Sequence, residues 1–192
     1  PLLGASDTLI LLVKDPNQCS FGTDSRVELR KADIQWYSFK EQLLMPWILY
    51  RTKADIIHIP HWNVPLLYRG PLVLTVHDLL LLHPEAEKSA KISTRHPFFF
   101  WMKRLGHRLT LWHAMRQAKV IFAPTEYVSK DIKYFYPNVV TPQVTSEGLS
   151  ALPIPRPQTL PYESFLFYVG SAYPHKRLDL ILEAWSTLTE RY

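Results

Sequence analysis

Short apolar runs alternate along this chain with longer segments of helical periodicity. The runs Leu9–Lys14, Asp55–Ile59, Leu72–Val76 and Lys119–Ala123 are five or six residues long, a length typical of strands. The segments between them repeat apolar residues at helical spacing. Strands that alternate with helices build parallel sheets. We therefore expect an α/β fold, a Rossmann-like and mostly parallel sheet flanked by helices, followed by an incomplete second domain of the same kind.

Local signals place the first and third of the expected helices. Ser38 and Glu41 have the spacing of a capping box, so a helix should begin there. Pro46 lies inside that helix and should kink it or mark its true start. Another helix should open at Thr125 and end at Pro137, because proline cannot continue a helix.

The helix expected between residues 97 and 118 has an apolar side and a basic side. We interpret the apolar side as facing the core and the basic side as facing solvent. The alternative is a basic, aromatic helix that lies on an anionic membrane surface. The apolar positions are Phe98, Trp101, Met102, Leu105, Leu109, Trp112 and Met115, and the basic side carries Lys103, Arg104, His107 and Arg108.

A proline-rich stretch divides the chain. We expect a first domain over residues 1–152, a stiff linker over residues 153–163, and the first strand and helix of a second domain over residues 164–192. The predicted strand in the last segment is "FLFYVG", which ends at Gly170.

The composition says more about the cellular compartment of the protein than about its function. A net charge of +5 and a pI near 9.3 suit anionic partners without choosing among them. The single cysteine, Cys19, excludes an internal disulfide framework and fits a reducing compartment. The apolar stretches are too short to cross a bilayer. We expect a cytoplasmic protein.

The strand expected at Leu72–Val76 ends in the pair His77-Asp78. In open α/β sheets, ligands bind beyond the carboxyl ends of the strands. The pair therefore either contacts a ligand there or only ends the strand with hydrogen bonds to the backbone. This feature alone leaves both interpretations open.

Two further stretches are candidate binding sites. His58 and His61 are three residues apart, but a structural zinc site needs four ligands and no others lie nearby, so we expect a substrate loop stiffened by Asn63 and the prolines instead of a metal site. Lys176 and Arg177 come at an expected helix start, where free amides and the helix dipole favour phosphate. The alternative there is a solvated basic turn.

Taken together, four separated stretches resemble one family. They are "DIIHIPHWNVPLLYRGPLVLTVHDLLLLHPE", "IFAPTEYVSKDI", "SEG" and "FLFYVGSAYPHKRLDLILEAW". In order and spacing they are similar to the retaining nucleotide-sugar glycosyltransferases of family four, which have the two-domain GT-B fold. The likeness is nearest to bacterial mannosyltransferase-like members that act on surface polysaccharide or lipid-linked glycans.

The resemblance implies roles by position. A nucleotide diphosphate sugar would be the donor, a glycan or lipid-linked molecule the acceptor, and neither a cofactor nor a metal would be needed. Positive groups would stabilise the leaving diphosphate. The residues implied are His77 and Asp78 for catalysis beside the donor sugar, Lys176, Arg177 and Gly170 for the donor diphosphate, and His61, Asn63, Glu147 and Gly148 for the acceptor side and cleft.

The chain also departs from the family pattern. Ser171 stands where family members usually carry an arginine. The family's paired glutamates, which contact the donor, would lie beyond Tyr192. We therefore expect this chain alone to be inactive, although the protein it comes from would be a hexosyltransferase, cytoplasmic or peripheral at the inner face of the membrane.

Two other functions stay open from the residues. A metal-dependent phosphohydrolase could use His77-Asp78 with His58 or His61 as further ligands. A non-catalytic basic and aromatic module could bind a membrane surface or nucleic acid. The sequence contains no recognisable nucleic-acid motif, so we expect no nucleic-acid partner and keep contact with an anionic membrane as the form of this alternative.

Overall fold

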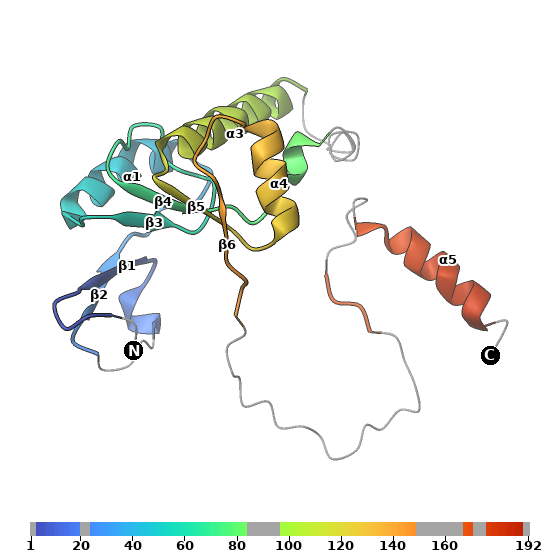
Figure 1. Ribbon diagram of the computed structural model, residues 1–192, viewed down its shortest axis with the longest axis horizontal. Coiled ribbons are helices and arrows are strands. Elements are labelled where there is room, and N and C mark those ends of the chain that lie inside the picture. Colours follow the sequence, from blue (N-terminus) through green and yellow to red (C-terminus); the bar gives the residue numbers. More distant parts are fainter. Residues whose placement is uncertain (1–2, 20–23, 84–96, 149–166, 171–175, 190–192) are drawn as a thin grey trace, which may run out of the picture. The chain divides into compact units, whose positions relative to one another are not determined.

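The structure is a computed structural model that describes residues 3–19, 24–83, 97–148, 167–170 and 176–189. The chain divides into two compact units. Unit 1 comprises Pro1–Leu79 and Arg95–Ser146, and unit 2 comprises Leu80–Thr94 and Glu147–Tyr192. Every strand pair is parallel and helices flank the sheets, so the protein is α/β and consistent with a Rossmann-like fold (Figure 1).

A four-stranded parallel sheet forms the centre of unit 1. Its strands are β3 (Ile57–Ile59), β4 (Leu72–Thr75), β5 (Val120–Ala123) and β6 (Gln143–Val144), in the order β3-β4-β5-β6. β3, β4 and β5 were expected from apolar runs in the sequence, and each is slightly shorter than its run. Because the strands are parallel and adjacent in chain order, their carboxyl ends lie at one edge of the sheet.

Within the described residues, one face of this sheet is buried more fully than the other. Figure 1 shows α1 (Phe39–Thr52) and α3 (Pro97–Gln117) along one side of it. Side chains alternate across the sheet, so β4 and β5 bury every second residue. The strand at 72–76 is therefore buried on one side and not on both. The covered face carries Leu72, Leu74, Val76, Ile121 and Ala123, whereas Val73, Thr75, Val120 and Phe122 stay partly exposed.

α1 begins with the capping box that the sequence predicts. Ser38 Oγ accepts a hydrogen bond from the Glu41 backbone N–H at 3.1 Å, and Glu41 Oε2 accepts one from the Tyr37 N–H at 2.7 Å. The helix continues through Pro46 to Thr52, so Pro46 does not mark its start. Proline removes only one helical hydrogen bond, and Pro46 is buried.

Most of the apolar side predicted for α3 does not face the core, which corrects our interpretation of that helix; of its described side chains only Met115 is buried. Trp101 is 59% exposed and Trp112 is 50% exposed. Two alanines on the opposite side allow close packing of the helix against the sheet, and α3 buries that side. The buried residues include Leu111, Ala114, Met115 and Ala118, and the exposed ones include Met102, Leu105 and Leu109.

α4 (Glu126–Phe135) ends unit 1's series of helices as expected. Thr125 Oγ1 caps it by accepting a hydrogen bond from the Val128 N–H at 3.2 Å. The helix stops just before Pro137. It leads into β6, and its buried residues Val128 and Ile132 pack into the core of unit 1.

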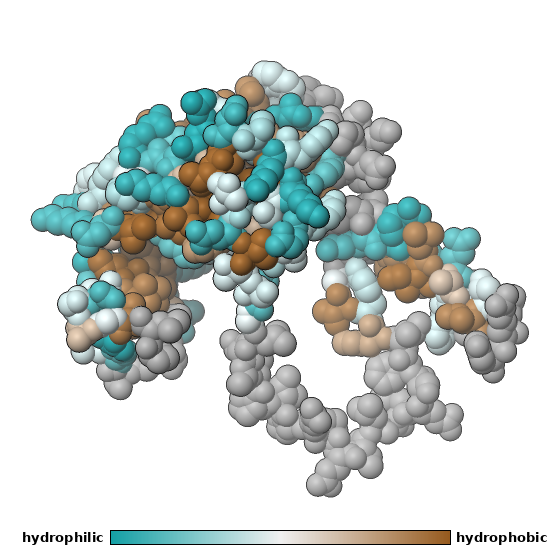
Figure 2. All heavy atoms as spheres, in the orientation of Figure 1, coloured by the Kyte–Doolittle hydropathy of each residue, from teal (hydrophilic) through white to brown (hydrophobic). Residues whose placement is uncertain are grey.

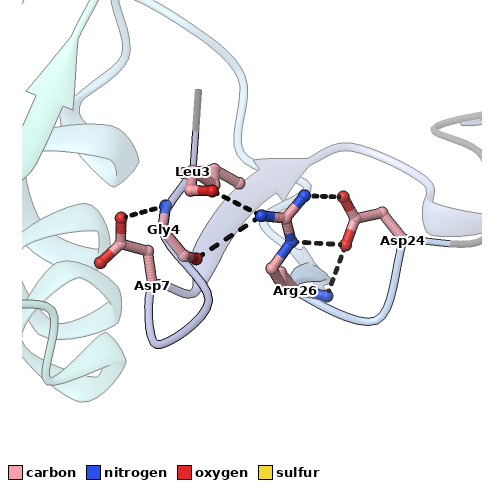
Figure 3. Close-up of polar contacts among 5 residues, drawn as sticks. All are labelled: Leu3, Gly4, Asp7, Asp24 and Arg26. Carbon is pink, nitrogen blue, oxygen red and sulfur yellow. Dashed lines mark hydrogen bonds and ion pairs between the residues drawn. The ribbon is translucent and has the colours of Figure 1, made fainter. Parts of the chain in front are cut away.

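A separate two-stranded parallel sheet joins β1 (Leu9–Val13) to β2 (Val27–Lys31). β1 was expected, but β2 was missed. A short 3-10 turn, η1 (Pro16–Gln18), follows β1. Arg26 secures the approach to β2: its guanidinium donates to the Leu3 carbonyl at 2.6 Å and pairs with Asp24 (Figure 3).

Unit 2 contains η2 (Leu80–Leu82) and α5 (Leu178–Thr189) in its described part. α5 was expected, but residues 167–170 form no strand, contrary to our prediction for "FLFYVG". A strand needs a neighbour to receive its hydrogen bonds, and the described part of unit 2 holds no other strand. α5 keeps apolar side chains on its surface (Figure 2). The predicted linker, residues 153–163, lies outside the described residues.

Candidate functional site

The loops that follow β3 and β4 meet at the carboxyl edge of the four-stranded sheet. His77 and Asp78 come directly after β4, and the "HIPHWN" segment leads out of β3. The His77 Nε2–H donates to the Pro60 carbonyl at 3.1 Å, because a carbonyl oxygen can only accept. This hydrogen bond holds the imidazole of His77 against the loop that carries His61 and Asn63.

The N-terminal turn of α1 holds the same loop from another side. Glu41 is only 6% exposed, and its Oε2 accepts a hydrogen bond from Asn63 Nδ2 at 2.9 Å. This contact fixes which end of the Asn63 amide faces Glu41 and so orients its carbonyl oxygen. Glu41 is therefore a positioning residue that the sequence predicted only as part of a helix cap.

His61 has a defined tautomer in this arrangement. The Asn63 backbone N–H donates to His61 Nδ1 at 3.3 Å, so Nδ1 is an acceptor. The proton of the neutral ring is then on Nε2, which lies 3.4 Å from the Tyr37 hydroxyl. His61 therefore presents an acceptor to its own loop and a donor to Tyr37.

α3 contributes His107, which sequence reasoning assigned to a solvated basic side. The ring of His107 meets the Trp62 ring edge-on, with centroids 4.2 Å apart. Trp62 also packs against His61, with centroids 4.7 Å apart. The sequence did contain a pattern that places His107: at helical spacing it lies on the same face of α3 as Leu111 and Ala114. Both of these residues are buried.

Burial keeps the imidazoles of His61 and His107 neutral near pH 7. It lowers the pKa of His107 to about 4, with the nearby His61 and Arg108 adding to the effect and Asp78 opposing it. Burial also lowers the pKa of His61, helped by His77 and opposed by Asp78. Asp78 thus lies within electrostatic reach of both rings.

These residues form what we call the edge cluster. It combines imidazoles, an amide, a phenol hydroxyl and carboxylates with the aromatic rings of Tyr37 and Trp62. Such groups bind a ligand rich in hydroxyls, because they donate and accept hydrogen bonds while the rings pack against C–H groups. The edge cluster consists of Tyr37, Glu41, His61, Trp62, Asn63, His77, Asp78 and His107.

His58 contacts a different set of residues. Its Nε2 lies 2.8 Å from Thr75 Oγ1, and its ring meets Phe122, both of which belong to the partly exposed face of the sheet. Among the described residues, no group of three or more His, Cys, Asp or Glu side chains is arranged to hold a metal ion.

The remaining predicted site residues belong to unit 2. Lys176 is exposed just before α5, and Arg177 pairs with Asp179 at 2.9 Å. Gly170 has a φ of 153°, a left-handed value that favours glycine. Glu147 and Gly148 are exposed after β6. Lys176 and Arg177 thus lie at the start of a helix, as predicted, and Arg177 forms an ion pair with the carboxylate of Asp179 in the first turn of that helix.

No family model matches the chain, and a search of curated proteins finds no match. Among the helices that the structure describes, none has both the length and the apolar character needed to cross a membrane.

Proposed function

We propose that this chain is the acceptor-side part of a retaining glycosyltransferase of the GT-B type. The enzyme would transfer a sugar from a nucleotide diphosphate sugar to a glycan or a lipid-linked acceptor in the cytoplasm. One observation carries the proposal: "TVHD" and "HIPHWN", two segments on which the family resemblance rests, meet at the carboxyl edge of the sheet through the bond between His77 and Pro60. Ligands bind at this edge in α/β folds.

The edge cluster offers suitable groups for the sugar side of such a reaction. His77, held by the Pro60 carbonyl, and Asp78 would face the donor sugar. His61 and Asn63 would contact the acceptor, with the amide of Asn63 oriented by Glu41. Neutral imidazoles can donate and accept hydrogen bonds with hydroxyl groups, whereas a cluster of imidazolium ions could only donate.

Unit 2 would supply the positive charge for the leaving diphosphate. Lys176 stands at the start of α5, where the helix dipole adds to its charge. Arg177 shares its guanidinium with Asp179, which leaves Lys176 as the principal contact in this proposal. Charge that develops on the diphosphate as the bond breaks would be stabilised without a metal ion.

Calorimetry with nucleotide sugars tests the proposal. UDP- and GDP-hexoses are titrated into this chain and into the natural polypeptide extended through a complete second domain. We expect binding to the extended polypeptide only, and expect Lys176→Ala to weaken it about tenfold or more, as for a lost charge-assisted contact. Lys130→Ala, an exposed lysine on α4, is the matched control. Absence of binding by either polypeptide would contradict the proposal.

A further inference from the structure

The outer face of α3 combines apolar side chains with arginines and no acidic residue. The whole helix, Pro97–Gln117, contains neither Asp nor Glu. Large apolar side chains that a soluble helix usually buries are open on this face. We call these residues the α3 outer face: Trp101, Met102, Leu105, Leu109 and Trp112, with Arg104, Arg108 and Arg116 among them.

A hollow lies within the α3 outer face. Trp101, Arg104, Leu105 and Arg108 line it, and its volume is about 190 Å³. The two arginines are one helical turn apart, so their guanidinium groups reach the same place. A hollow with two guanidinium groups beside a tryptophan and a leucine matches a ligand that joins a phosphate to an apolar chain.

A tryptophan and an arginine are paired further along the same face. The guanidinium carbon of Arg116 lies 5.1 Å from the centroid of the Trp112 ring. Tryptophan and arginine are residues that settle at the boundary between lipid headgroups and acyl chains. Trp112 and Arg116 therefore continue the combination of aromatic and basic side chains along the helix for two turns beyond the hollow.

We propose that the α3 outer face docks unit 1 onto a bilayer that contains anionic phospholipids. The arginines contact lipid phosphates, and the leucines, methionine and tryptophans enter the boundary with the acyl chains. The positive charge of the α3 outer face is complementary to an anionic lipid surface, whereas a neutral lipid surface offers it no electrostatic attraction. This proposal is independent of the transferase activity. Nucleic acid fits less well, because Met102, Leu105 and Leu109 offer it nothing to contact.

Vesicle co-sedimentation of the 192-residue chain tests the proposal. The probe is vesicles of phosphatidylcholine alone or with a third phosphatidylglycerol, at about 0.15 M salt, where exposed charges are screened within about 8 Å. We expect binding to the anionic vesicles and little to the neutral ones. Equal partitioning to both, or to neither, would overturn the proposal.

Charge variants locate the surface. Arg104→Ala/Arg108→Ala/Arg116→Ala should weaken binding on the order of a hundredfold, since each basic residue at an anionic surface contributes about fivefold. Lys40→Ala/Lys130→Ala/Lys133→Ala removes the same charge from exposed positions on α1 and α4 and should weaken it much less. Equal losses from the two triple variants would show attraction by net charge and overturn the assignment to α3.

An apolar variant separates insertion from charge attraction. Trp112→Ala should lower binding and reduce the blue shift of tryptophan fluorescence on adding anionic vesicles, compared with the parent chain, because Trp101 remains on the same face. Trp47→Ala is the control, because Trp47 also pairs with an arginine, at 4.0 Å, on α1. Both tryptophans are exposed, so the two variants should have the same melting temperature as the parent chain. A larger loss from Trp47→Ala, or tighter binding of the chain to duplex DNA than to vesicles, would overturn the proposal.

Discussion

Glu41 connects α1 to the loop after β3 through one buried carboxylate oxygen. That oxygen accepts hydrogen bonds from the Tyr37 backbone N–H and from the Asn63 amide. Glu41→Ala should therefore lower the free energy of unfolding by about 2–3 kcal/mol, because it leaves two donors without their partner. The measurement is urea denaturation followed by circular dichroism.

Two variants show whether the bond to the loop accounts for this loss. Glu41→Gln keeps an acceptor oxygen and should lose clearly less. Ser38→Ala removes the cap contact to the Glu41 N–H and the hydrogen bond that Ser38 Oγ donates to the Gln35 carbonyl, leaves the contact between Glu41 and Asn63 in place, and should cost about 1 kcal/mol. If Glu41→Ala cost no more than Ser38→Ala, the carboxylate would not be securing the loop.

Residues of the edge cluster differ in how far the sequence could reveal them. His77, Asp78, His61 and Asn63 follow strands, and the rule about carboxyl ends of parallel strands points to them. His107 comes from a helix that is apolar on both sides, so periodicity alone could not tell which side packs on the sheet. Its place beside Trp62 depends on tertiary packing.

At the scale of secondary-structure elements, the segment from Pro65 to Gly70 contacts both α1 and α3 and so links the two helices. Tyr68 is buried, packs against the Tyr50 ring of α1, and its carbonyl accepts from His113 Nε2 of α3 at 3.1 Å. A Cβ atom on Gly70 would collide with the Tyr68 hydroxyl and ring. The buried ring has little room to move away, because it packs against Tyr50 and its hydroxyl donates to the Pro71 carbonyl at 3.3 Å.

Gly70→Ala should therefore destabilise unit 1 by about 1–3 kcal/mol, as overpacking does in a filled core. Gly106→Ala is the matched control, because no neighbouring atom lies within 4 Å of the added Cβ. In the exposed interior of α3 that change should stabilise by about 0.5–1 kcal/mol. Thermal denaturation of both variants gives the comparison, and an unchanged melting temperature for Gly70→Ala would contradict the close packing of Tyr68.

Most of the helices and strands could be predicted from the sequence, because apolar residues recur at different intervals in strands and in helices. Apolar runs predicted β1, β3, β4 and β5, and cap chemistry predicted the starts of α1 and α4. β2 was missed although "VELRK" alternates apolar and charged residues over its first four positions. Residues 167–170 were wrongly expected to be a strand, because an apolar run cannot show whether a neighbouring strand exists to pair with it.

At the scale of the whole molecule, buried histidines should make stability depend on pH. Burial lowers the pKa of His61, His107 and His113 below 6.5, so the folded state favours neutral rings. The unfolded chain binds protons first as the pH falls, and the stabilisation present above pH 6.5 is lost between pH 6.5 and about 4.

The free energy of unfolding should therefore fall over this range. The shift of His107 alone corresponds to about 3 kcal/mol in a fully buried site, and its partial exposure reduces this to about 1–2 kcal/mol. Urea denaturation at a series of pH values measures the fall, and imidazole NMR should show His107 titrating near its pKa of about 4. A titration midpoint for His107 near 6.5 would contradict its burial against Trp62.

We propose that the edge cluster is the working site of a sugar transferase. The most direct measurement is hexose transfer from UDP- and GDP-hexoses by the polypeptide extended through a complete second domain, comparing His77→Ala with His58→Ala. His58 is the control because its contacts are with Thr75 and Phe122 of the sheet and not with the edge cluster. We predict transfer with retention, a kcat/KM lowered on the order of a hundredfold by His77→Ala, and little change with His58→Ala. No transfer from any donor, or equal activity of the two variants, would contradict the account.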